Sequence, residues 1–180
     1  MATTFANADF KSGSEVFITY GHRSNHDLFL FSGFVDVSMT KYDYAKIWVA
    51  IPVSDQLYAQ KAKVLSKFGL KPSCHLDLCG SPIIESSKPL LVFLTVLYMD
   101  AQSLDVVDTL MSKSDGNPGQ IEIDERAFLW VRERIGIMMK SLKLNHSRIV
   151  DQGVHGIVRD VYEAEMRFLI SICDDQLVRI

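Results

Sequence analysis

The stretch VFITYGHRSNHDLFLFSGF, residues 16–34, carries the clearest local structural signals in the chain. Residues 16–20 alternate as a strand does and are rich in β-branched and aromatic side chains. A glycine follows, Ser24 is a good helix N-cap, and Gly33 suits the left-handed conformation that closes a helix. The stretch therefore predicts a strand that ends on Tyr20, a turn and a short helix. Loops held by rigid elements often carry function, so Tyr20 is either a working residue or an ordinary core tyrosine.

The composition is that of an ordinary globular protein, with 180 residues, 48% hydrophobic and 23% charged. The longest nearly apolar run, residues 89–99, is shorter than the roughly 20 residues of a membrane helix, so we expect no membrane segment. A net charge of -3 with scattered basic residues argues against nucleic-acid binding. The N-terminus lacks the features of a signal peptide, and the three cysteines have no framework spacing. We therefore expect a cytoplasmic location, with the nucleus as an additional one.

The chain divides into two regimes. Residues 1–52 lean towards β structure, with a second strand at 44–51 that Pro52 closes, and strand signals nearly vanish beyond that point. Helical spacing then takes over. Helices are expected to begin at Ser54, at Pro89, at Asp100 and after Asp124, and the last covers residues 157–172. The predicted fold class is α+β and mostly α, in which a short β-rich piece precedes an all-α helical bundle over residues 53–180.

Two groups of residues have side chains of the types that bind metals, and neither has the spacing of a metal site. Cys74, His75 and Cys79 lie close together but lack paired Cys-x-x-Cys spacing and a second pair. His22 and His26 are four residues apart, yet the glycine turn puts His22 outside the helix that carries His26. We expect no metal.

The opening stretch resembles the end of the catalytic SET domain in the protein methyltransferases related to the Rubisco lysine methyltransferase. In that family a strand ends in Tyr-Gly. The sequence x-[RK]-[ST]-N comes next, followed by a short helix and then Gly-Phe. The matching residues are Tyr20-Gly21, Arg23-Ser24-Asn25 and Gly33-Phe34. The helical segments after residue 52 resemble the same family's substrate-binding domain, and SDQLYAQKAKVL, residues 54–65, is most similar to the branch that methylates a histidine of actin.

Two departures from the family pattern affect what we expect of this chain. The family usually has an asparagine before the aspartate that corresponds to Asp43, and this sequence lacks it. The family's upstream cofactor-binding segments, including an Asn-His pair, also have no counterpart. We therefore expect a C-terminal portion of a longer enzyme, with residues 1–52 as the end of a SET domain and residues 53–180 as the helical substrate-binding domain.

The resemblance implies S-adenosylmethionine-dependent transfer of a methyl group to a histidine of a protein, with actin as the expected partner. By position, Tyr20 matches the family's active-site tyrosine, and Ser32, Gly33 and Phe34 match the stretch that lines the cofactor site. Arg23 matches a position near the groove for the protein substrate. Each also has a plainer reading: Gly33 is a helix C-cap in any case, Phe34 is simply apolar, and Arg23 is an ordinary turn residue.

Three interpretations of the chain remain open at this point. It is a protein-histidine methyltransferase, with lysine as the alternative acceptor, and is by itself weakly active or inactive. Alternatively, it is a non-catalytic helical module that binds a protein. The third interpretation is an inactive, poorly stable fragment with unpaired strand edges.

Overall fold

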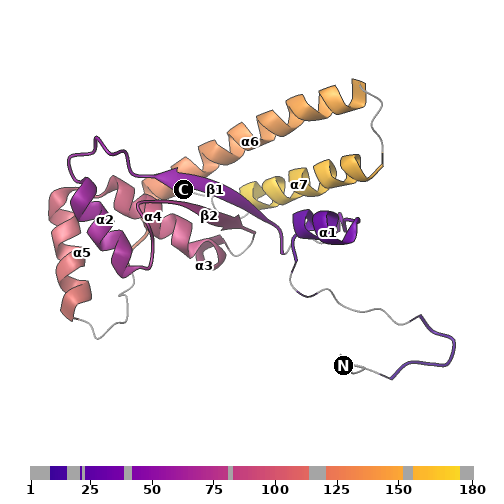
Figure 1. Cartoon of the computed structure of the whole chain (residues 1–180), viewed down its shortest axis with the longest axis horizontal. Coiled ribbons are helices and arrows are strands. Elements are labelled where there is room, and N and C mark those ends of the chain that lie inside the picture. Colours follow the sequence, from indigo (N-terminus) through magenta and orange to yellow (C-terminus); the bar gives the residue numbers. More distant parts are fainter. Residues whose placement is uncertain are drawn as a thin grey trace.

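The computed structural model describes residues 9–15, 21, 23–38, 42–80, 83–113, 121–151 and 156–174 (Figure 1). The predicted strand at 16–20 lies outside these residues and stays a prediction. The described helices are α1 (Asn25–Ser32), α2 (Tyr58–Lys67), α3 (Ile83–Ser86), α4 (Lys88–Tyr98), α5 (Ala101–Lys113), α6 (Glu125–Asp151) and α7 (Ile157–Asp174). The described strands are β1 (Tyr44–Ala50) and β2 (Ser73–Cys79). The predicted fold class, α+β and mostly α, is confirmed.

The described strands form a two-stranded antiparallel sheet, in which Tyr44 pairs with Cys79 and Ala50 with Ser73. The prediction that strand signals nearly vanish after residue 52 was wrong, because β2 lies there. Its sequence SCHLDLC does alternate, with Leu78 buried and its neighbours more exposed, which is the pattern of a strand with one covered face. Pairing with β1 satisfies the backbone groups that face the partner strand, and one face of the sheet is buried on the helices.

Most predicted helix starts are confirmed, and one was wrong. The Asp100 and Asp124 carboxylates accept from the backbone N–H groups of Ser103 and Arg126, each at 2.8 Å, as helix caps do. Ser54 does not cap a helix, because turns fill the chain as far as Tyr58, where α2 begins. In those turns Asp55 Oδ1 accepts from the N–H of Leu57 at 2.7 Å.

One hydrophobic core joins the sheet to the helices. Residues 90–96 of α4 are all buried, because sheet and helices cover that helix on every side. Ile47 and Val49 of β1 belong to the same cluster as Phe168 and Ile172 of α7. The sheet pairing and this core therefore span both sides of residue 52, the predicted domain boundary. Among the described helices, none is long and apolar enough to cross a membrane.

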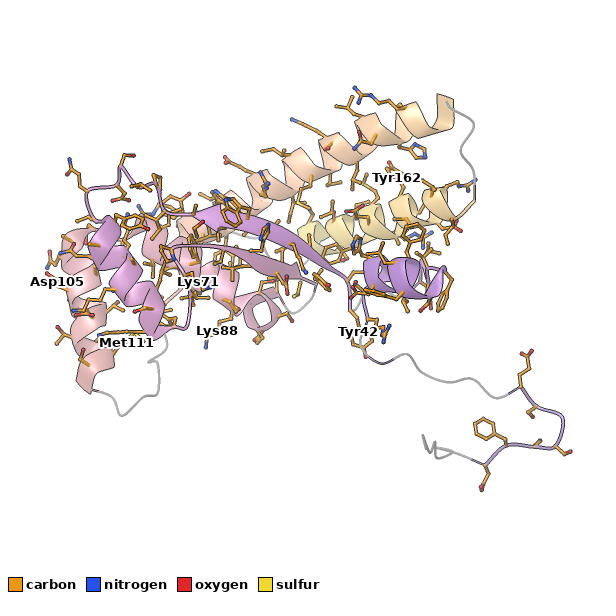
Figure 2. All side chains as sticks on the ribbon, viewed as in Figure 1. Tyr42, Lys71, Lys88, Asp105, Met111 and Tyr162 are labelled. Carbon is orange, nitrogen blue, oxygen red and sulfur yellow. The ribbon has the colours of Figure 1, made fainter. Side chains whose placement is uncertain are left out.

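The long helices α6 and α7 run side by side, and α1 packs against α7 (Figure 1). Figure 2 shows Tyr162 of α7 in the space between α6 and α7, where its ring stacks on His146 with centroids 4.0 Å apart. Through α7, the short helix of the opening motif is attached to the helical bundle.

Candidate functional site

The helix of the opening motif begins and ends where its capping residues predict. Ser24 Oγ accepts from the backbone N–H of Asp27 at 3.1 Å and donates to the Asp27 carboxylate at 2.9 Å. At the other end Gly33 takes the left-handed conformation, with φ 73° and ψ 16°, and its N–H donates to the Phe29 carbonyl. Both caps come from local chemistry, so the sequence alone was sufficient to locate α1.

Asn25, at the first position of α1, is the centre of a buried polar network. Its backbone N–H and its side-chain Nδ2 donate to the two carboxylate oxygens of Asp43, at 2.5 and 2.9 Å. Its Oδ1 accepts from the backbone N–H of Asp36 at 2.7 Å. Asn25 and Asp43 are only 5% and 6% exposed. Burial raises the pKa of Asp43 above its usual range, although the two hydrogen bonds from Asn25 lower it.

The predicted site residues lie at the two ends of α1. Tyr20 lies outside the described residues. Arg23 is exposed immediately before the helix, whereas Ser32 is half-buried in its last turn and Gly33 and Phe34 follow it. An eight-residue helix is about 12 Å long, so Arg23 stands well apart from the predicted cofactor stretch.

The surface around Gly33 has the character expected of a cofactor wall. A Cβ built on Gly33 would have no heavy atom within 4 Å, so the backbone is open to close approach there. Phe34 is 40% exposed, and Leu30 and Phe31 of α1 are 57% and 75% exposed. An open glycine backbone beside an exposed aromatic ring suits a nucleoside-bearing cofactor, so these residues fit the group that the resemblance implies.

A cleft of about 460 Å³ lies between α1, the start of β1, α6 and α7, and Leu30 and Phe31 also line it. Its lining combines apolar side chains with His26, Asp27, Asp43 and Glu165. Partial burial in the cleft raises the pKa of Glu165, the charge of His26 lowers it, and the charge of Asp43 raises it. Sequence periodicity gave no hint of this cleft, because its walls come from segments more than 100 residues apart.

Cys74, His75 and Cys79 all lie on β2, and neighbouring strand residues point to opposite faces. His75 packs edge-on against the Trp48 ring of β1, with centroids 4.8 Å apart. Burial, together with the charge of Asp77, raises the pKa of the Cys79 thiol, which disfavours the thiolate that metals bind. In the part of the chain that the structure describes, no three His, Cys, Asp or Glu residues are grouped to hold a metal ion.

Residues 52–178 match the model of a known protein family, described as Rubisco LSMT substrate-binding. The chain belongs to the Rubisco LSMT substrate-binding family. The matched region includes α2 to α7 and β2, so it covers the helical bundle and one strand of the sheet. The opening motif, which contains α1, lies before the matched region.

Curated relatives also match this chain in sequence. The chain is 29% identical over 147 residues to an actin-histidine N-methyltransferase of Rhinolophus ferrumequinum, which covers 76% of this chain and 24% of that protein. It is 40% identical over 94 residues to an actin-histidine N-methyltransferase of Drosophila melanogaster, covering 52% of this chain and 17% of that protein. The chain thus spans a quarter or less of the length of these relatives.

Solved structures show the same fold. The SET domain of LSMT bound to lysine and AdoHcy superposes with a TM-score of 0.58 at 17% sequence identity. The match covers 93% of this chain and 40% of that chain. Rubisco LSMT bound to sinefungin and monomethyllysine gives a TM-score of 0.57 over 90% of this chain. The arrangement of motif helix, sheet and helical bundle is therefore that of the LSMT fold.

Proposed function

We propose that this chain forms part of an S-adenosylmethionine-dependent protein methyltransferase that modifies a histidine of actin. The observation that carries the proposal is the 29% identity over 147 residues to proteins named actin-histidine N-methyltransferase, which reaches over 76% of this chain. A protein of this function would act in the cytoplasm and also in the nucleus.

The proposed cofactor-binding residues are Ser32, Gly33 and Phe34. The cofactor supplies an activated methyl group on a sulfonium when bound. Gly33 would allow close approach of its backbone, and the exposed ring of Phe34 would provide an apolar face that excludes water. Because methyl transfer is a direct displacement, holding the two reactants in line supplies much of the rate.

Tyr20 is the proposed catalytic residue, and Arg23 the proposed contact to the protein substrate. The Tyr20 hydroxyl would act as a fixed dipole that orients the acceptor nitrogen. A free tyrosine titrates near pH ~10, so we assign it no role as a general base. A histidine acceptor suits this arrangement, because imidazole is neutral over much of the physiological range, whereas a lysine acceptor must first lose a proton.

A second candidate function is a non-catalytic module that binds a protein. It is favoured by the family match, because the matched model is a substrate-binding one and covers residues 52–178 only. The α1 motif would then have a structural role, and actin or another protein would bind to the helical bundle without being modified.

One experiment separates these candidates. The whole chain is incubated with actin and S-adenosylmethionine, and methylated histidine is measured by mass spectrometry in parallel with actin pull-down and cofactor calorimetry. Methylation that is lost in Tyr20→Phe but kept in Tyr162→Phe, a matched change between α6 and α7, would support the catalytic proposal. Actin capture without methylation would support the binding module, and the absence of all three signals would refute both.

A further inference from the structure

The buried network at the start of α1 joins three separate parts of the chain through one side chain. Asn25 bonds to Asp43 immediately before β1 and to Asp36 in the segment after α1, while it is itself part of the helix. The partners are 18 and 11 residues away in sequence, so no local turn or helix rule accounts for these bonds. A buried side chain that uses both its donor and its acceptor defines the relative positions of the segments it joins.

Those segments carry the residues of the proposed function. In the sequence Tyr20 comes shortly before Asn25, and Gly33 and Phe34 come shortly before Asp36. We infer that Asn25 is a positioning residue, which holds the cofactor stretch Ser32–Phe34 in a fixed place relative to the start of α1. The inference rests on the proposed function for the role of that stretch in cofactor binding.

An asparagine amide is suited to this place, because it presents one donor and one acceptor at the same carbon. A carboxylate at position 25 would keep the acceptor for the Asp36 N–H but would lose the donor to Asp43. It would also face the Asp43 carboxylate at hydrogen-bond distance, where two buried like charges repel strongly. Asn25→Asp therefore removes one bond and adds a repulsion with almost no change in shape.

The reverse change, Asp43→Asn, makes it possible to test the pair by swapping the two side chains. In the double variant Asn25→Asp with Asp43→Asn, the amide donor comes from position 43 and the acceptor from position 25. The amide oxygen at position 43 still accepts from the backbone N–H at position 25, and the Asp36 N–H keeps its acceptor. All three bonds are restored with the same number of charges, so the double variant should recover what each single variant loses.

The experiment measures amide exchange by NMR and S-adenosylmethionine affinity by calorimetry on the whole chain. In Asn25→Asp, repulsion from the Asp43 carboxylate should push the side chain at position 25 away from the Asp36 N–H, so exchange at the Asp36 amide should become faster. The cofactor affinity should become weaker by about tenfold or more, as expected for losing a hydrogen bond to a charged group. The double variant should return both values to within about threefold of the wild type. The matched control is Val64→Ala, a core change on α2, which packs against α4 and α5.

The outcomes of this experiment decide the inference. The inference is established if Asn25→Asp changes both the Asp36 amide exchange and the cofactor affinity, the double variant restores both, and Val64→Ala changes neither. The inference is overturned if Asn25→Asp has the exchange rate and the affinity of the wild type. It is also overturned if Val64→Ala, at an equal loss of melting temperature, changes both quantities as Asn25→Asp does. If the wild-type chain binds no cofactor, the proposed function fails, and the Asp36 exchange alone decides whether Asn25 fixes the stretch. If Asn25→Asp does not fold, a folded double variant supports the pairing and an unfolded one refutes it.

Discussion

Gly33 and Gly136 offer the same perturbation, one added methyl group, in two different backbone conformations. Gly33 ends α1 with φ 73°, whereas Gly136 lies inside α6. At both positions an added Cβ would meet no heavy atom within 4 Å, so packing makes no difference between them. Gly33→Ala and Gly136→Ala therefore isolate the conformational cost of the methyl group.

The two substitutions should change stability in opposite directions. An alanine held in the left-handed conformation costs about 1–2 kcal/mol. An alanine in place of a glycine inside a helix gains about 0.5–1 kcal/mol. The expected difference in the free energy of unfolding is therefore about 2 kcal/mol, which corresponds to about 4–8 °C in melting temperature for a chain of this size.

Urea denaturation followed by circular dichroism measures the global effect, and native-state hydrogen exchange at the α1 amides measures any loss confined to that helix. Gly33→Asn is a useful third variant, because asparagine tolerates the left-handed region better than alanine does. It should lose less than Gly33→Ala. Equal stability of Gly33→Ala and the wild type by both methods, or a loss in Gly136→Ala, would refute the reasoning.

Three further changes test the polar groups of the bundle. Thr95 is 2% exposed, and its Oγ1 accepts from the Asp124 N–H at 3.1 Å. Thr95→Val should therefore lower the free energy of unfolding, measured by urea denaturation, by about 1–2 kcal/mol. The same change at the exposed Thr109 should not lower it. Burial raises the pKa of Glu165, so the folded state binds its proton more tightly and the stability of the wild type should fall as pH rises from 4.5. Glu165→Gln should make that fall smaller, and identical pH profiles of the two proteins would contradict this. Hydrogen bonds from Lys61 and from the Leu57 N–H lower the pKa of Asp55, so the wild type should lose stability as the pH falls below 3.8 and this carboxylate is protonated. Asp55→Asn should make that loss smaller, as measured by acid-unfolding curves.

The sequence predicted those features that neighbouring residues determine. The N-cap of α1 and the starts of α5 and α6 depend on side chains that bond to backbone groups two or three residues away. The start of α2 was misplaced because Ser54 has the chemistry of a cap, while the turns around Asp55 extend to Tyr58.

Features that depend on distant residues could not be predicted in the same way. The strand β2 is stable because it pairs with β1 and covers α4, and its short alternation was not sufficient by itself to indicate a strand. Asn25 is part of the sequence motif, but the bonds of Asn25 to Asp43 and Asp36 form only where three segments of the chain meet. The cleft beside Glu165 likewise exists only because α7 returns to pack on α1.

The pairing of β1 with β2 has a practical consequence for expressing the helical region by itself. A shortened protein that starts at residue 53, where sequence composition changes, would lack Ile47 and Val49, two buried members of the core. It would also leave the backbone of β2 without its partner, as an open edge prone to aggregation. A start before Tyr44 keeps the sheet intact, and comparing the solubility of the two shortened proteins would show how far the helical bundle depends on that one strand.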